Sequence, residues 1–242
     1  MAIQNFDYKK CSRPLLFKEN DEYIPYSLGG TCFLFEYENH HYIITAMHCL
    51  KARDIASITV LIDPWSSDKE LYPFSFTSPF HILPNGTDPD EDYLDFICYP
   101  VDAREINEET AKFFVPFQKV FDDDFSLEQR QICVVGYPDP VHDIDYDKAI
   151  YESATAVISA TNIVKEENFM YEIQLPDTLL SSYNGFSGSP VYCSNNKGDI
   201  KIIGMVLRGG AESKKLHFLD IRIIRAGIHG VLHSEIPDTQ GR

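Results

Sequence analysis

Three side chains of this 242-residue chain are of the types that together catalyse acyl transfer: His48, Asp95 and Ser187. A serine hydroxyl is a weak nucleophile at neutral pH, so it needs a base to take its proton as it attacks. The base in turn needs an anion that fixes its tautomer and stabilises its charged form. The sequence therefore predicts His48 as general base and acid, Asp95 as the orienting carboxylate and Ser187 as the nucleophile.

The segments around these residues resemble the motifs of the trypsin-like (chymotrypsin-fold) serine peptidases. Residues 45–49 read Thr-Ala-Met-His-Cys, similar to the family's Thr-Ala-Ala-His-Cys, and residues 185–190 read Gly-Phe-Ser-Gly-Ser-Pro, similar to its Gly-Asn-Ser-Gly-Ser-Pro. His48 precedes Asp95 by 47 residues, and Asp95 precedes Ser187 by 92. These separations fit the way the family divides its triad between two barrels. The resemblance covers roughly residues 28–225 and implies a serine endopeptidase, similar to bacterial members without disulfides.

Of the three candidate catalytic residues, the aspartate is the one for which the sequence offers alternatives. Asp88, Asp90 and Asp92 lie in the polar, proline-bearing segment just before Asp95. Asp95 is favoured because the apolar run 96–99 follows it directly, which places its carboxylate at the mouth of a buried strand, as in the family's Asp-apolar-Ala-apolar pattern.

The glycines around the nucleophile suit a tight turn. Gly185 lets the backbone approach closely, so the N–H groups of Gly185 and Ser187 are expected to bind the oxyanion of the tetrahedral intermediate. Position 189 is serine, which excludes the Gly-x-Ser-x-Gly elbow of α/β-hydrolases. A second hypothesis from another class stays open: a pseudoprotease, in which the cleft expected between the two barrels binds peptides or partners without catalysis.

The resemblance also locates a substrate pocket. Ser181 stands six residues before the nucleophile, where trypsin carries an aspartate, so a preference for Lys or Arg is not expected. Segment 204–210 corresponds to the strand that lines the substrate backbone, which makes Arg208 and Gly209 substrate-binding candidates. Arg208 could select an acidic residue through a charge-assisted contact, or it could be a solvated side chain at a loop edge.

Two positions depart from the family pattern. Phe186 replaces the aspartate that pairs with a freed N-terminus in digestive members, so activation by N-terminal cleavage is not expected. Leu207 stands where a serine usually supports the triad. An intracellular protease of this kind needs control, so regulation by a partner protein or by an incompletely formed oxyanion hole is a further hypothesis.

Composition limits the partners and the location. The net charge of −16 and the pI near 4.8 disfavour nucleic acid and anionic membranes as partners, and they leave protein or peptide substrates. No apolar run is long enough to span a membrane, and the first residues lack the apolar core of a secretory signal. A cytoplasmic location is expected.

The six cysteines are expected to be free thiols in a reducing compartment. Most of them lie in apolar, strand-like runs, where a reduced thiol behaves as a small hydrophobe. None forms a Cys-x-x-Cys pair, so no zinc site is predicted, and the proposed mechanism needs neither a metal nor a cofactor.

The rest of the chain indicates an all-β fold. Short apolar or alternating runs predict strands, and together they favour a chymotrypsin-like double six-stranded antiparallel β-barrel with short helices. A hairpin tip is expected at 38–41. The predicted strands lie at 31–37, 42–46, 58–62, 96–99, 131–135, 154–158, 169–175, 200–207 and 216–221.

Two helices and one boundary complete the prediction. A helix is expected at about 102–114, capped by Asp102, and a second at about 223–232. The boundary near residue 118 assigns His48 and Asp95 to an N-terminal barrel, 1–117, and Ser187 to a C-terminal barrel, 118–242.

Three acidic segments, 87–92, 122–124 and 142–147, invite comparison with calcium-binding loops. The last has alternating aspartates, but Lys148 and Ala154 stand where an EF-hand needs glycine and glutamate. All three are interpreted as solvated loops.

Overall fold

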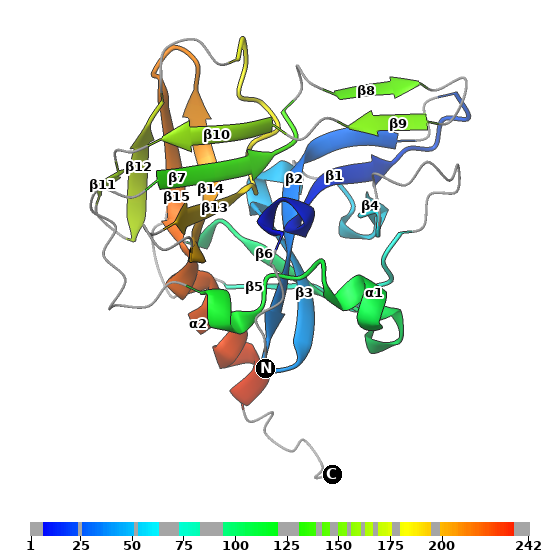
Figure 1. Cartoon of the computed structure of the whole chain (residues 1–242). Coiled ribbons are helices and arrows are strands. Elements are labelled where there is room, and N and C mark those ends of the chain that lie inside the picture. Colours follow the sequence, from blue (N-terminus) through cyan, green and yellow to red (C-terminus); the bar gives the residue numbers. More distant parts are fainter. Residues whose placement is uncertain are drawn as a thin grey trace.

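The fold is built from two antiparallel sheets, each curled into a half-barrel (Figure 1). This computed structural model describes residues 7–23, 26–50, 53–62, 73–82, 94–120, 131–138, 142–145, 150–153, 156–160, 163–166, 169–175, 180–194 and 199–234. The predicted all-β, double-barrel architecture is confirmed, although the described residues form sheets of six and seven strands where six and six were predicted.

The first sheet has the order β4-β1-β2-β3-β6-β5. Its strands are β1 (Ser12–Lys18), β2 (Tyr26–Tyr37), β3 (His40–Thr45), β4 (Ile58–Thr59), β5 (Phe80–His81) and β6 (Ile97–Pro100). The second sheet has the order β10-β7-β13-β14-β15-β12-β11. Its strands are β7 (Gln131–Gly136), β10 (Ala156–Ala160), β11 (Ile163–Lys165), β12 (Met170–Gln174), β13 (Pro190–Ser194), β14 (Ile200–Gly210) and β15 (Lys215–Asp220).

The hairpin between β2 and β3 has a two-residue loop. Tyr37 pairs with His40, and Glu38 and Asn39 take φ values of 48° and 63°. A hairpin with both loop residues in the left-handed region matches the right-handed twist of its strands, and Asn tolerates that conformation well. The predicted hairpin is confirmed, but its loop is Glu38 and Asn39 alone, because His40 and His41 of the predicted tip belong to β3.

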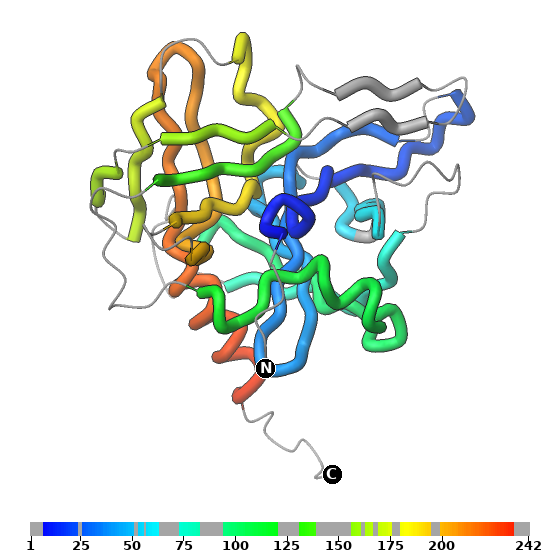
Figure 2. Tube along the Cα trace, viewed as in Figure 1, coloured from blue at the N-terminus to red at the C-terminus, as the bar shows by residue number. Residues whose placement is uncertain are grey.

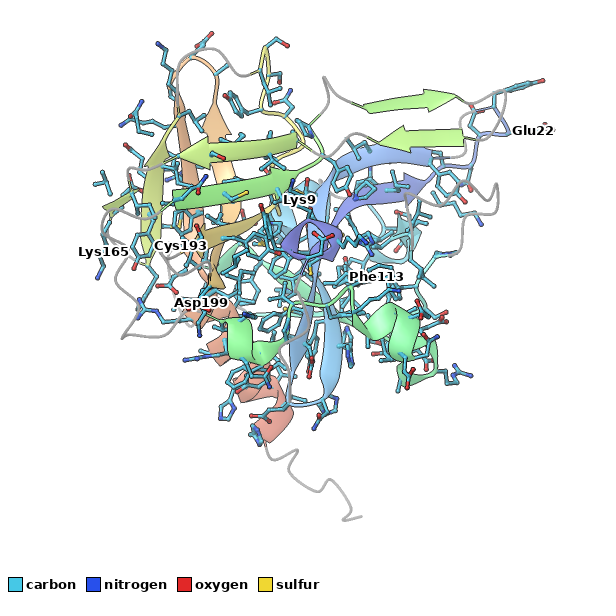
Figure 3. All side chains as sticks on the ribbon, in the orientation of Figure 1. Lys9, Glu22, Phe113, Lys165, Cys193 and Asp199 are labelled. Carbon is cyan, nitrogen blue, oxygen red and sulfur yellow. The ribbon has the colours of Figure 1, made fainter. Side chains whose placement is uncertain are left out.

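Buried polar contacts join the two sheets. The hydroxyl of Ser12 in β1 donates to the carbonyl of Val135 in β7 at 2.9 Å. The N–H of Tyr137 donates to the hydroxyl of Thr31 in β2 at 2.9 Å, and the Tyr137 hydroxyl donates to the Ser12 carbonyl at 3.3 Å. Apolar side chains of both sheets fill one continuous core around these contacts (Figure 3).

Helix α2 (Ile221–His233) follows β15 and confirms the predicted C-terminal helix. The Asp220 carboxylate caps it by accepting from the Arg222 N–H, while Ile224 and Ile228 bury its apolar face. The trace in Figure 2 runs from the second sheet down this helix toward the hairpin of β2 and β3. The Tyr37 hydroxyl lies 3.0 Å from Nδ1 of His229, which fixes that contact.

The predicted helix at 102–114 is wrong as one continuous element. Two short helices stand there: a 3₁₀ turn, Ala103–Glu105, capped by Asp102, and α1 (Glu108–Ala111), capped by Asn107. Asn107 has an extended backbone and forms a capping box with Thr110. It therefore begins a second helix, whereas the sequence predicted that one helix continues through this position.

Other local predictions need correction. Strand β1 was not predicted, because Arg13 and Pro14 break the apolar pattern that marks a strand. His142–Asp145 is not a loop but strand β8, paired with β9 (Ile150–Ser153). The segments 87–92 and 122–124 lie outside the described residues.

The boundary near residue 118 stays a prediction. Val115 bridges to Phe35 in the first sheet, whereas Val120 bridges to Ile202 in the second.

Candidate active site

His48 lies in a 3₁₀ turn, Met47–Leu50, that begins two residues after β3 ends. Strand β6 pairs with β3, Thr45 opposite Ile97, so the residues just outside these two paired positions are brought together. Those residues include His48 on one side and Asp95 on the other. Antiparallel pairing of two adjacent strands thus closes the 47-residue separation in sequence.

Both carboxylate oxygens of Asp95 contact His48. The His48 N–H donates to Oδ1 at 2.9 Å, and the ring Nδ1 lies 2.5 Å from Oδ2. Because a carboxylate only accepts, Nδ1 carries the proton in this contact, and Nε2 of the neutral ring is left as an acceptor. The imidazole is 44% exposed, so Nε2 faces a region that substrate could reach.

The competing carboxylates Asp88, Asp90 and Asp92 lie outside the described residues.

The turn that carries Ser187 is bonded to both sheets. The Thr31 N–H donates to the Ser187 carbonyl at 3.0 Å, and the Gly188 N–H donates to the Val206 carbonyl at 2.8 Å. The Cys49 thiol lies 3.6 Å from the Ser187 carbonyl oxygen. Since Cys49 directly follows His48, the nucleophile candidate and the base candidate lie in one neighbourhood at the junction of the two sheets.

Gly188 shows how closely this turn packs against the first sheet. Its φ is +86°, and a Cβ added there would lie 1.9 Å from the Thr31 carbonyl oxygen and 2.5 Å from the Thr45 hydroxyl. Only glycine fits this position, both for its backbone conformation and for the space available.

The Ser187 hydroxyl donates to the Leu207 carbonyl at 2.9 Å. Leu207 lies at a β-bulge, because the register between β14 and β15 shifts between Val206 and Arg208. Among the described residues no hydrogen bond joins Ser187 to His48. The structure therefore brings the histidine and aspartate into contact and gives the serine hydroxyl a different partner.

Two N–H groups of the turn are available to an incoming anion. Gly185 has φ +91°, and its carbonyl accepts from the Thr31 hydroxyl at 2.7 Å, which fixes the peptide. Within the described part of the chain, neither the Gly185 N–H nor the Ser187 N–H has a hydrogen-bond acceptor. These are the two groups expected from the sequence to form an oxyanion hole.

The predicted pocket residues are at the surface. Ser181 is exposed in a bend before the turn, and Arg208 and Gly209 are exposed on β14. Both β14 residues follow Leu207, whose carbonyl contacts the Ser187 hydroxyl, so they are near it along the strand. Gly209 has φ +155°, and a Cβ there would lie 2.3 Å from the Lys215 carbonyl oxygen.

All six cysteines are free thiols, and five are buried. Burial raises the pKa of Cys11, Cys32 and Cys98, which keeps these thiols protonated. They act as core side chains and not as nucleophiles.

A cluster of His and Glu side chains was missed in the sequence. His229 and His233 of α2 lie beside Glu38 of the β2–β3 hairpin, 195 residues away from His233. The His-x₃-His spacing on a helix was the available signal, because residues four apart share a helix face.

No protein-family model matches this chain, and no curated protein matches it either. Among the described helices, none combines the length and apolar character needed to cross a lipid bilayer.

Proposed function

We propose that the protein is a serine endopeptidase that cleaves proteins or peptides through an acyl-enzyme. The observation that carries the proposal is the contact between His48 Nδ1 and the Asp95 carboxylate, made beside the turn that holds Ser187. Two β half-barrels and the local motifs agree with the trypsin-like resemblance.

Each group of the site has a role in the two steps of the proposed reaction. His48 Nε2 takes the proton of the Ser187 hydroxyl as Oγ bonds to the scissile carbonyl carbon. The carbonyl oxygen becomes an oxyanion, which the N–H groups of Gly185 and Ser187 bind. The same proton passes to the departing amine as the C–N bond breaks. Water, deprotonated by His48 Nε2, then attacks the ester carbon, and the same proton returns to Ser187 Oγ as the C–O bond breaks and the acid is released.

The Ser187 hydroxyl must leave Leu207 for this step. Its hydrogen bond to the Leu207 carbonyl holds the proton away from His48, and rotation about the Cα–Cβ bond of Ser187 would free it. A resting state of this kind supports control of activity by substrate or by a protein partner in the cytoplasm.

The same hydrogen bond favours the alternative function. If the hydroxyl stays on Leu207, the surface around His48 and Ser187 would bind peptides or partners without cleaving them. The two functions differ in one property, which is whether Ser187 can be acylated or phosphonylated.

A fluorophosphonate probe tests this difference. The endopeptidase proposal expects labelling of the wild-type chain at Ser187, identified by peptide mass spectrometry. Ser187→Ala is expected to remain unlabelled, and His48→Ala to label at least about 10³-fold more slowly. Ser182→Ala, a change in the same loop, is the matched control and keeps full labelling. A folded wild-type chain that never labels would leave only the binding function.

Substrate preference is a separate question within the proposal. Arg208 is exposed beside the site and is a candidate to attract an acidic side chain at the cleavage position. Cleavage profiling with a peptide library, for wild type and Arg208→Gln, measures that preference. Equal cleavage after acidic and neutral residues by the wild type would remove this role from Arg208.

A further inference from the structure

A compact group of metal-ligating side chains joins the two ends of the fold. Glu38, His229 and His233 each offer one ligand atom, and these atoms lie within 4.8 Å of one another. The Glu38 carboxylate lies 2.8 Å from His233 Nε2 through Oε2 and 3.6 Å from His229 Nδ1 through Oε1. All three side chains are exposed, so an ion could enter from solvent.

The elements that carry these residues hold them in place. The imidazoles are one turn apart on α2, with ring centroids 4.3 Å apart. The backbone of Glu38 is in the left-handed region in the two-residue hairpin loop, and its carboxylate contacts both histidines. Tyr37 contacts the His229 ring edge to face at 6.2 Å, and its hydroxyl lies 3.0 Å from Nδ1. The ring contacts position the two imidazoles, and an ion bound at His229 Nδ1 would displace the Tyr37 hydroxyl from that nitrogen.

We propose that Glu38, His229 and His233 bind a divalent transition-metal ion, with Zn²⁺ as the ion of reference. Two imidazoles and one carboxylate form a ligand set that suits Zn²⁺, and water completes its four-coordinate shell. A hard ion such as Mg²⁺ or Ca²⁺ prefers an all-oxygen site and is excluded by this donor set. The net charge of −16 further favours a cation.

The ion would connect the two half-barrels. Glu38 belongs to the hairpin of the first sheet, whereas both histidines belong to the helix that follows the last strand of the second sheet. In the absence of metal, the Glu38 carboxylate contacts His233, and hydrogen bonding from that histidine lowers the pKa of the carboxyl. Metal bonds at the same place would stabilise the packing of α2 against the hairpin.

A second cluster of the described residues suits a metal less well. Glu166, Glu172 and His217 also lie together, but the ammonium of Lys215 contacts the Glu172 carboxylate at 2.8 Å. That cation already neutralises one ligand and repels a metal ion. The second cluster therefore serves as an internal comparison.

The test uses the full chain without a histidine tag, titrated with ZnCl₂ in a calorimeter under reducing conditions. One Zn²⁺ is expected to bind per chain, with a dissociation constant below ~100 μM. His233→Ala and Glu38→Gln are expected to weaken binding at least about tenfold. His40→Ala, which removes an exposed histidine of the same hairpin, and His217→Ala, in the second cluster, are expected to bind as the wild type does.

Stability and spectroscopy give independent readouts. Zn²⁺ at a hundredfold excess over its dissociation constant is expected to raise the wild-type Tm by about 5–10 °C, and His233→Ala is expected to lose that shift. His233→Gln serves in the same role if the alanine variant is unstable. Co²⁺ bound in place of Zn²⁺ should give visible d–d bands that vanish in the ligand variants. The proposal is overturned if the wild type does not bind Zn²⁺, or if the variants bind it equally well.

Discussion

Asp95 accepts two hydrogen bonds from one residue, His48, through a different carboxylate oxygen for each. Oδ1 accepts from the backbone N–H at 2.9 Å, and Oδ2 lies 2.5 Å from the ring Nδ1. The backbone contact fixes the carboxylate, and the fixed carboxylate orients the ring. The histidine and the carboxylate of the proposed catalytic site are therefore in contact without substrate.

Asp95→Asn is expected to lower kcat/KM by about 10⁴-fold with little change in fold. An amide can donate to Nδ1, which selects the tautomer that protonates Nε2 and removes the base. Asp102→Asn, which changes a helix-capping carboxylate away from the site, is the control and should retain activity. Peptide hydrolysis rates measure the effect, and equal loss in both variants would contradict this role for Asp95.

Gly188→Ala is expected to destabilise the protein by about 3 kcal/mol and to lower activity. The added methyl meets the Thr31 carbonyl in a backbone conformation that alanine rarely adopts. Gly230→Ala is the matched control. It also replaces a glycine, in helix α2, but a Cβ at that position has no atom within 4 Å. It should stabilise by about 0.5–1 kcal/mol. Urea unfolding compares the two, and equal stabilities would refute the steric account.

Arg13→Met is expected to cost about 3 kcal/mol of unfolding free energy. The guanidinium is fully buried and donates to the carbonyls of Ser12, Leu61 and Ile62 at 2.8–3.0 Å and also to that of Lys10. A methionine fills the volume but removes four hydrogen bonds to backbone carbonyls, although the Ser12 carbonyl keeps the Tyr137 hydroxyl as a donor.

The control for this prediction is Arg104→Met. The Arg104 side chain is 89% exposed and pairs with Asp102 at the surface, so its loss should cost less than about 1 kcal/mol. Chemical unfolding of both variants gives the comparison. Equal costs would mean that the buried hydrogen bonds of Arg13 add little.

Stability is expected to fall as the pH rises above about 9. Burial raises the pKa of the Cys11, Cys32 and Cys98 thiols above the ordinary value of 9.0, so the unfolded chain releases these protons while the folded chain keeps them. Each thiol lowers the free energy of unfolding by about 1.4 kcal/mol for every pH unit above that value and has no effect on it below that value.

Urea unfolding under reducing conditions at pH 7.5, 9.5 and 10.5 measures this loss. Cys98→Val should reduce the slope by one thiol's share, because valine has no proton to release. A slope identical to that of the wild type would show that Cys98 does not take part.

Much of the architecture could be predicted from local patterns. Short apolar runs predicted β2, β7 and β14, and the structure buries most of the residues in those runs. The periodic apolar face of the C-terminal segment predicted helix α2. The hairpin loop was predictable because Asn39 tolerates the left-handed conformation that its turn requires. These are properties of neighbouring residues, so they can be recognised in the sequence alone.

Strand β1 was invisible to the same reasoning. A charged residue and a proline near its start resemble a loop, yet Arg13 is buried because the carbonyls of the distant residues 61 and 62 accept hydrogen bonds from its guanidinium. The split of the 102–114 helix has a similar origin, since Asn107 and Thr110 cap a new helix in competition with the old one. Long-range partners and competing caps do not appear in a local pattern.

Sequence alone established the chemical types and their order along the chain: an imidazole, a carboxylate and a hydroxyl, each with its own short motif. Only the folded structure decided which atoms meet. In the structure the Asp95 carboxylate contacts His48, the Ser187 hydroxyl donates to the Leu207 carbonyl, and Glu38 lies beside two histidines of α2. The physical reason is that strand pairing and chain reversal set distances between residues far apart in sequence, and hydrogen-bond geometry changes over fractions of an ångström.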